Sequence, residues 1–359
     1  MVYRRAYVTL VGVAVVMGTL ALVVSLKYDR PLLDPEGKFL GPSWARLPLL
    51  LMGAVLLDLV PLTLWRSRLR PAAIIPLVRE RLRTHWTPER MTLVALGVVC
   101  FYVTYVSYRN LKSALPFVRS FNNPNDMFDR ELNTIDRVLF FGNQPGPVLH
   151  NLLGTDLSAH GLSYIYLWFL PLVPLALTAW LVWSRNISYG YWFATSQCLA
   201  WSLGTASYYA LPTLGPVFHF APGYTALAHT PTTDLIEGLS RSRNKVLHGD
   251  YDGSSVEGIV NSVAGFASLH SGITLLVALM VQFTLRNQLL KVVFWVNFAL
   301  TVVATIYFGW HYLADDIAGI MIAFVSFYLG GIATGQKFNR HSLQSHPTTT
   351  SANVPVSID

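Results

Sequence analysis

Long apolar stretches recur along the chain and are separated by shorter polar segments. We identify eight stretches near the length of about 20 residues that a hydrocarbon core of about 30 Å requires. They cover residues 7–26, 44–65, 91–108, 161–184, 190–211, 265–284, 291–308 and 313–333. The pattern predicts an all-α integral membrane protein with about eight transmembrane helices, of which the last six form a core preceded by two extra helices.

Two segments between the predicted spans are too long to be simple connections. In residues 125–141 the apolar side chains recur with a helical period, at Met127, Phe128, Leu132, Ile135 and Leu139. Charged residues occupy the other faces, so this segment predicts an outer interfacial helix that lies on the membrane. Its start is predicted at Asn123-Pro124-Asn125-Asp126. Residues 212–261 are rich in Gly, Pro, Thr and Ser and predict an irregular cap.

Composition and charge refine this picture. Hydrophobic residues make up 53% of the chain and charged residues 13%, which excludes an ordinary soluble domain. Seven arginines lie between positions 66 and 90, whereas acidic residues gather in the two long segments. Because basic loops stay on the cytoplasmic side, both termini are predicted to be cytoplasmic and the long segments to face outward. The net charge of +7 is expected to lie mainly on the cytoplasmic face, where it faces anionic lipids, and no nucleic acid is expected as a partner.

The same pattern predicts three regions. Residues 1–90 hold two transmembrane helices and a basic cytoplasmic loop, residues 91–334 a catalytic membrane region, and residues 335–359 a polar, disordered cytoplasmic tail. Asp58 lies inside the second span, where a charge is costly in lipid, so it is expected to face the bundle. Five histidines lack the spacing of metal ligands and are expected to be solvated: His150, His160, His219, His229 and His248.

Two histidines and a carboxylate lie where predicted spans reach the outer face. His270 opens the span 265–284, and His311 and Asp315 open the span 313–333. A spacing of four residues predicts that His311 and Asp315 share one helical face, so that the carboxylate holds one ring nitrogen and leaves the other free to attack. The separate imidazole of His270 can protonate a leaving oxygen.

Positive charge is expected from Lys112 and Arg119, which follow the span 91–108. Seven residues is about two helical turns, so both cations can point the same way. Arginine binds phosphate oxygens bidentately and lysine binds them as a point charge. The alternative interpretation is that both side chains are anchors that snorkel to the membrane interface.

These residues resemble the signatures of the type-2 phosphatidic acid phosphatase superfamily. Its first motif is Lys-x6-Arg-Pro, which Lys112 and Arg119 match with Ser120 in place of the proline. Its second is Pro-Ser-Gly-His, which Ala267-Ser268-Leu269-His270 matches at Ser268 and His270. The Ser-Leu-His-Ser-Gly form of this motif is similar to the branch that includes fungal inositol phosphorylceramide synthase.

The third motif of that superfamily is Ser-Arg-x5-His-x3-Asp. His311 and Asp315 match it, but Ala304 and Thr305 stand where serine and arginine are expected. The absence of this arginine is a second feature in which the chain resembles the inositol phosphorylceramide synthase branch. Two interpretations of the absence remain open: Arg109 or Arg137 compensates for it, or the pocket suits a phosphodiester with less charge.

The resemblance covers about residues 100–330 and implies an active site on the non-cytoplasmic face. It implies that His311 is the nucleophile that forms a phosphohistidine, that Asp315 orients it and that His270 is the general acid. Lys112, Arg119, Ser268 and nearby backbone amides would hold the phosphoryl oxygens, with no metal or other cofactor. Asp316 is expected to be a supporting partner or a helix N-terminal charge.

Three functions remain open from the sequence. With a lipid or sugar alcohol as acceptor, the protein is a phosphoryl or phospho-head-group transferase that acts on a phospholipid or prenyl-phosphate donor and is inositol-phosphotransferase-like. With water as acceptor, it is a lipid phosphate or prenyl pyrophosphate phosphatase. The third is a transporter or scaffold without catalytic activity, for which paired discontinuous helices would be expected. The branch resemblance favours the first.

Overall fold

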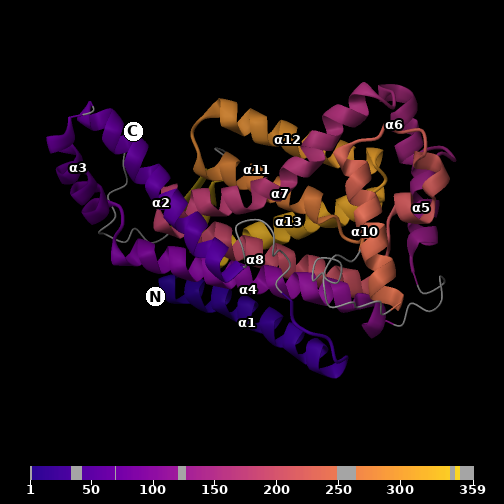
Figure 1. Cartoon of the computed structure of the whole chain (residues 1–359), viewed down its shortest axis with the longest axis horizontal. Coiled ribbons are helices and arrows are strands. Elements are labelled where there is room, and N and C mark those ends of the chain that lie inside the picture. Colours follow the sequence, from indigo (N-terminus) through magenta and orange to yellow (C-terminus); the bar gives the residue numbers. More distant parts are fainter. Residues whose placement is uncertain are drawn as a thin grey trace.

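The computed structural model of the chain is almost entirely helical (Figure 1). It describes residues 2–33, 43–68, 70–119, 127–248, 264–339 and 344–347. Each of the eight predicted apolar stretches coincides with a helix, so the all-α fold class is confirmed. These helices are α1 (Val2–Lys27), α2 (Ser43–Ser67), α4 (Pro88–Val118), α7 (Leu157–Trp183), α8 (Ile187–Ala210), α11 (Leu269–Thr284), α12 (Gln288–Tyr307) and α13 (Leu313–Ala333).

Membrane crossing is supported by helix length and composition. Among the described residues, five helices are long and apolar enough to cross a membrane, namely α1, α4, α7, α12 and α13. α11 is apolar but has only 16 residues. The total of eight spans therefore stays a prediction.

The remaining elements lie at the two ends of the bundle. α3 (Pro71–Thr84) lies at one end, and α5 (Asp129–Leu139), α6 (Pro145–Leu153) and α10 (Pro231–His248) lie at the other (Figure 1). Two short helices, α9 (Pro216–His219) and η2 (Ala221–Tyr224), precede α10. The outer segment 212–261 thus contains three helices and is not the irregular cap that its composition predicted; its residues 249–263 lie outside the described residues.

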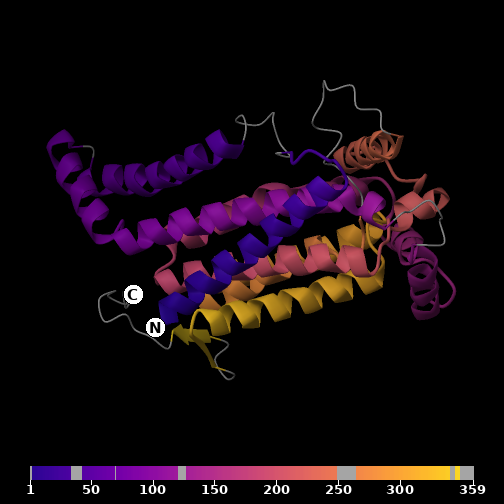
Figure 2. The ribbon, with the colours of Figure 1, turned by 90° about the horizontal axis from the view of Figure 1, so that it is seen from below.

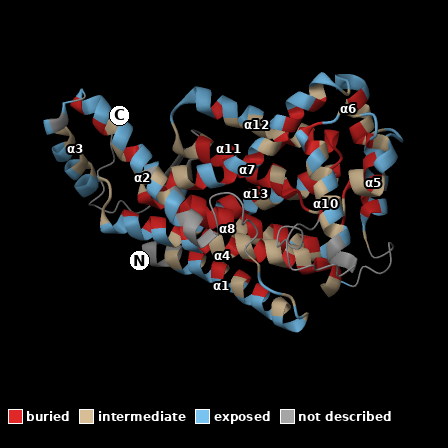
Figure 3. Cartoon of the chain, in the orientation of Figure 1, coloured by how far each residue is buried: buried red, intermediate tan, exposed pale blue. Residues whose placement is uncertain are grey.

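α8 forms the centre of the bundle. Tyr191, Trp192, Phe193 and Ala194 are four consecutive residues with no exposed surface, so this helix is surrounded on every side. Buried residues concentrate on the inner faces of the neighbouring helices, and exposed ones lie on the outer faces of α1, α2 and α12 (Figure 3). Many of these exposed residues are large and apolar, as lipid contact requires.

Glycines let α11 approach α13 closely. A Cβ atom on Gly319 would lie 2.1 Å from the carbonyl oxygen of Ser268, and one on Gly272 would lie 2.8 Å from the carbonyl oxygen of Gly319. In membranes, small residues at such contacts allow helix backbones to pack directly. The N-terminal ends of α11 and α13 are therefore held together, and these ends carry His270 and Asp315.

A buried ion pair joins α2 to α3 at the opposite end. The Arg81 guanidinium donates to both carboxylate oxygens of Asp58, at 3.1 and 2.7 Å, and Trp86 Nε1 donates to the same carboxylate at 3.1 Å. Asp58 is 6% exposed and so is removed from lipid, as expected, but these partners are not on the other helices of the bundle. Its partners come from α3 and the following turn.

The C-terminal segment begins with a strand pair. β1 (Gln336–Asn339) pairs antiparallel with β2 (Gln344–Pro347), which corrects the expectation of disorder for these residues. The pair lies at the same end of the bundle as the start of α1 (Figure 2). Phe338 anchors it, because its ring packs against Trp192 and Phe327 at centroid distances of 5.5 and 5.7 Å. Residues 348–359 lie outside the described residues.

We predict that Gly319→Ala separates α11 from α13. The added Cβ atom meets backbone, which cannot rotate away, so we expect a loss of about 1–3 kcal/mol in the free energy of unfolding. Unfolding by sodium dodecyl sulfate in mixed micelles measures this loss. Gly161→Ala on α7 is the matched control, because a Cβ atom there has no neighbour within 4 Å. Equal stability of the two variants would show that the close contact is not required.

Candidate active site

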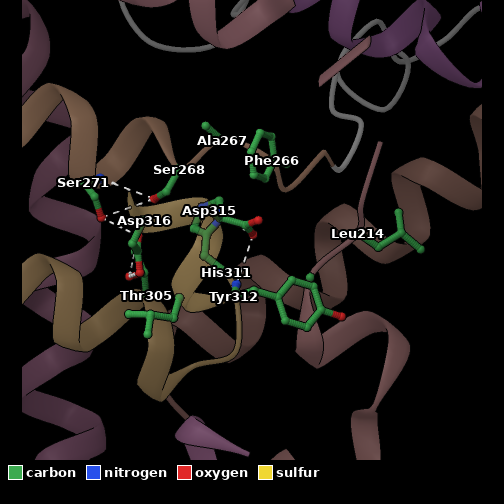
Figure 4. A network of polar contacts seen from close by, with 12 residues as sticks. Leu214, Phe266, Ala267, Ser268, Ser271, Thr305, His311, Tyr312, Asp315 and Asp316 are labelled. Carbon is green, nitrogen blue, oxygen red and sulfur yellow. Dashed lines mark hydrogen bonds and ion pairs between the residues drawn. The ribbon is translucent and has the colours of Figure 1, made fainter. Parts of the chain in front are cut away.

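His311 lies in the loop between α12 and α13. Tyr312 is the N-cap of α13, and Asp315 accepts a hydrogen bond from the Tyr312 backbone N–H at 3.0 Å in a capping box. The same carboxylate oxygen lies 3.4 Å from His311 Nδ1 (Figure 4). The two side chains therefore meet, but the shared helical face predicted for them is wrong, because His311 precedes the helix. The 3.4 Å separation is long, as catalytic hydrogen bonds often are before substrate binds.

His270 occupies the first turn of α11 and faces His311. The centroids of the two imidazole rings are 6.1 Å apart. His270 stacks on Tyr166 at 4.4 Å with an interplanar angle of 17°, and Phe169 lies 4.1 Å from it. Trp310 stacks on Tyr166 at 5.2 Å. Aromatic side chains of α7 thus fix the orientation of the His270 ring.

A backbone hydrogen bond links the two histidine-bearing segments. The Ser268 N–H donates to the Asp315 carbonyl oxygen at 2.9 Å. Ser268 is also the N-cap of α11, and its hydroxyl contacts Ser271. The predicted contact of Ser268 with a phosphate oxygen stays a prediction, since its hydroxyl serves the helix end in this structure.

Asp316 is surrounded by hydroxyl groups. The Ser271 hydroxyl donates to it, and the Thr305 hydroxyl donates to it at 3.0 Å (Figure 4). Thr305 occupies the position of the arginine in the third motif of the resembled superfamily. A neutral hydroxyl therefore donates to the Asp316 carboxylate at this position. Asp316 is 1% exposed and contacts side chains of both α11 and α12, in keeping with a supporting partner.

Lys112 is a predicted phosphate-binding cation whose charge reaches both histidines. α4 continues to Val118, so Lys112 lies within the helix, with its Nζ atom 5.9 Å from the Tyr108 ring centroid and 5.6 Å from that of Tyr208. Its charge acts on both His270 and His311. This placement supports the predicted phosphate-binding role more than the role of a snorkelling anchor.

The other selected cations contact different groups. Arg119 is exposed at the end of α4 and donates to the Ala210 carbonyl oxygen at 3.2 Å. Arg109 donates to the Tyr105 hydroxyl at 3.0 Å. Arg137 is exposed on α5. Compensation for the absent motif arginine by Arg109 or Arg137 therefore stays a prediction.

His311 is held in its neutral form. Burial lowers the pKa of its imidazole from 6.5 to about 4; the charge of Lys112 acts in the same direction and that of Asp316 in the opposite one. At neutral pH the ring therefore keeps a lone pair on one nitrogen. Beside a carboxylate that can fix the tautomer, this is the state that a nucleophile needs.

Two acids of α5, which our sequence reasoning did not select, hold the His311 loop. Asp129 accepts hydrogen bonds from the Leu214 and Gly215 N–H groups and from the Tyr312 hydroxyl, at 2.9 to 3.1 Å. Asp136 accepts from the Leu313 N–H at 3.2 Å. Asp129 thus joins the segment before α9 to the side chain of Tyr312, and Asp136 holds the backbone where α13 begins, two residues after His311.

The orientation of α5 explains why these acids are buried. Asp129 and Asp136 are 0% and 2% exposed, whereas Ile135 and Leu139 on the apolar face are 46% and 52% exposed. Ile135 and Leu139 thus point outward, as the predicted interfacial helix requires, whereas Leu132 of the same face is 7% exposed and the two acids point into the protein. Burial raises the pKa of Asp136 from 3.8 to about 6. In the sequence, the signal for this arrangement was the spacing of seven residues, about two helical turns, between Asp129 and Asp136. The predicted helix start at 123–126 lies outside the described residues.

His150 is buried and does not have the solvated position that we expected. It is 7% exposed, and its Nε2 atom lies 2.7 Å from the Tyr307 carbonyl oxygen at the end of α12. Burial lowers the pKa of its ring. His160 and His229 are exposed, as predicted.

Comparison with known proteins defines the class. The model of the PAP2 superfamily matches residues 130–329, which is more than half of the chain. The chain therefore belongs to the PAP2 superfamily, whose members are membrane lipid phosphatases and phosphotransferases. The match contains His270, His311 and Asp315, while Lys112 and Arg119 precede it. Neither a curated protein nor a solved structure matches the chain.

We predict that Asp129→Asn slows catalysis without preventing lipid binding. The amide offers one acceptor oxygen in place of two and turns N–H groups toward the N–H donors of Leu214 and Gly215, so the His311 loop shifts. We expect kcat to fall about 10- to 100-fold while KM stays within about threefold. Steady-state assays with phosphatidic acid and phosphatidylinositol donors test this. Glu131→Gln, on the exposed face of the same helix, is the control; matching kinetics for both variants would refute the positioning role.

Proposed function

We propose that the protein is a membrane phosphotransferase that moves a phosphate-bearing head group from a lipid donor to an alcohol through a phosphohistidine on His311. The observation on which the proposal rests is the arrangement of His270 and His311, whose ring centroids are 6.1 Å apart. Asp315 lies against one of these rings, and the charge of Lys112 acts on both.

In the first step, the free ring nitrogen of His311 attacks phosphorus. A P–N bond forms, and the bond from phosphorus to the lipid oxygen breaks. His270, which is protonated when the anionic phosphate lies beside it, gives its proton to that leaving oxygen. Asp315 holds the tautomer of His311 and stabilises the positive charge that develops on the ring. Lys112, with Arg119 and Ser268 in the predicted supporting roles, balances charge on the phosphoryl oxygens.

In the second step, the acceptor hydroxyl replaces the nitrogen. His270, now neutral, takes the hydroxyl proton as the acceptor oxygen attacks phosphorus. The P–N bond breaks, and His311 leaves as the neutral ring that began the cycle. Both histidines return to their initial protonation states, so the cycle is complete without a redox partner.

The place of Thr305 favours a phosphodiester donor. The neutral Thr305 hydroxyl bonds Asp316 where the resembling motif has arginine. A phosphodiester carries one negative charge at neutral pH, whereas a phosphomonoester carries about two, so a site with fewer cations suits the diester better. An inositol-phosphotransferase-like reaction, as in the branch that the second motif resembles, is of this kind.

The position of the site in the bundle supports an active site on the non-cytoplasmic face. α3 carries Arg79, Arg81 and Arg83, and it lies at the end of the bundle opposite α5 and α6 (Figure 1). Because dense basic segments remain on the cytoplasmic side, we assign α3 to that side and the histidines to the opposite one. Residues 91–334 would then form the catalytic region.

We predict that His311→Ala abolishes turnover with the fold intact. Purified wild type and variant are incubated with phosphatidic acid, prenyl pyrophosphate or phosphatidylinositol in membranes that contain a lipid alcohol, and both phases are examined by mass spectrometry. We expect the wild type alone to form a new phosphodiester lipid from phosphatidylinositol. His160→Ala, which removes an exposed histidine, is the control.

The other possible results of this experiment would each indicate a different function. Inorganic phosphate released by the wild type, without a new diester, would identify a phosphatase with water as acceptor and contradict the transferase. Equal activity of wild type and His311→Ala would contradict the phosphohistidine. The absence of any reaction by the wild type would favour a transporter or scaffold.

A further inference from the structure

The apolar side chains of α5 and of the turn after it point away from the protein. Val138 is 74% exposed and Phe141 is 95% exposed, and Ile135 and Leu139 are about half exposed. We call these four residues the apolar edge. Leu132 is the single apolar residue of α5 that is buried. Because a helix of 11 residues is marginal in water unless an apolar face is packed, α5 needs a further partner that covers its apolar edge.

The lipid-facing side of α13 leads to this edge. α13 is long and apolar enough to cross a membrane, and its exposed residues include Ile317, Met321 and Phe324, whose spacing places them on one helical face. Leu313 lies four residues before Ile317 on the same face, and its N–H donates to Asp136 of α5 at 3.2 Å. α5 runs across this end of the bundle (Figure 1). The apolar edge therefore continues the surface that α13 presents to lipid.

The charge of α5 supports a bilayer as this partner. Arg130 and Arg137 are exposed, so two cations accompany the apolar side chains. Apolar and basic residues exposed together on a short helix are typical of helices that lie at the boundary between the acyl chains and the head groups of a membrane. A bilayer offers both the apolar phase and the phosphate groups that this combination needs.

The buried acids of α5 hold the segment that carries His311. Asp129 accepts a hydrogen bond from the Tyr312 hydroxyl at 3.0 Å, and Asp136 accepts the Leu313 N–H. Tyr312 and Leu313 are the two residues that follow His311 in the chain. Since both acids belong to one short helix, a displacement of α5 would disturb both contacts together.

We infer that the apolar edge of α5 lies in the membrane leaflet at this end of the bundle, and that the bilayer thereby holds Asp129 and Asp136 against the residues that follow His311. The membrane is then a partner that orders the active site. The inference rests on the proposed function only in taking His311 as the nucleophile, and it applies whether the acceptor is an alcohol or water. The sequence predicts an interfacial helix here, and the contacts of its buried acids link that helix to catalysis.

Electron paramagnetic resonance of the full chain in liposomes tests where the apolar edge lies. A nitroxide is attached to Phe141→Cys in a background in which the buried Cys100 and Cys198 are replaced by alanine. We expect the nitroxide to be relaxed more by oxygen, which dissolves in lipid, than by a water-soluble nickel chelate. Met321→Cys, on the exposed face of α13, is the lipid reference, and Asp234→Cys, exposed on α10, is the water reference. The label at residue 141 should resemble the lipid reference.

Kinetics of serine variants test the link from the edge to the site. Val138→Ser with Phe141→Ser is compared with wild type in proteoliposomes, and the donor is supplied as a bilayer lipid or in its water-soluble dihexanoyl form. Because the His311 segment is disturbed whichever form binds, we expect kcat to fall about 10-fold for both forms while KM changes less than about threefold. Val138→Leu with Phe141→Leu keeps the edge apolar and should retain the wild-type kcat. Leu289→Ser with Val292→Ser, at exposed positions of α12, is the matched control.

Other results would overturn the inference. A label at residue 141 that follows the water reference would show that the edge lies outside the membrane, and a label shielded from both reagents would show that a second copy of the chain covers it. Serine variants that keep the wild-type kcat, or that raise only the KM of the bilayer donor, would show that the edge does not order the site. The proposed function fails separately, if the wild type turns over neither phosphatidylinositol nor phosphatidic acid; the position of the label then still supports or overturns the placement of α5.

Discussion

The direct backbone contact between α11 and α13 is the constraint on which the site depends. Gly272 and Gly319 leave no room for a side chain, and the Ser268 N–H bonds the Asp315 carbonyl oxygen across the same contact. One histidine belongs to each of the two segments joined there. Because the two N-terminal ends are fixed against each other and the loop that carries His311 leads directly into α13, the helix packing limits how far the two imidazoles can separate.

Around that contact, the protein buries four carboxylates, whose hydrogen-bond partners are mainly neutral donors; Asp315 Oδ1 has no partner among the described residues. Backbone N–H and hydroxyl groups bond Asp129, Asp136 and Asp316, while Asp315 holds the Tyr312 N–H. Such donors avoid the cost of burying a bare charge. Among the described cations, Lys112 acts on both histidines and Arg243 acts on Asp129, and the acidic groups nearby disfavour a doubly charged phosphate. This balance is consistent with a phosphodiester and with the replacement of the motif arginine by Thr305.

The fold class and the proximity of the candidate site residues were predictable from the sequence because they depend on strong local patterns. Eight apolar stretches became helices, and His270, His311, Asp315 and Lys112 lie together as their motifs implied. The role of α5 was not predictable in the same way. Its charged face was expected to face water, but its acids bond backbone groups of Leu214, Gly215 and Leu313, which are distant in the sequence.

Other errors have the same cause. His150 and Phe338 are buried by partners from distant helices, so composition alone predicted a solvated ring and a disordered tail. Arg119 has the right spacing from Lys112, but the end of α4 at Val118 turns it toward the Ala210 carbonyl. Helical spacing predicts which residues share a face only while the helix continues.

The central claim is that His311 carries the transferred group. Wild-type protein is mixed with phosphatidylinositol, quenched under alkaline conditions that preserve phosphohistidine, and digested for tandem mass spectrometry. The account predicts an adduct on His311 whose mass is that of phosphate together with the head group, and no adduct in the His311→Ala protein. An adduct on another residue, or turnover without any adduct on His311, would contradict it.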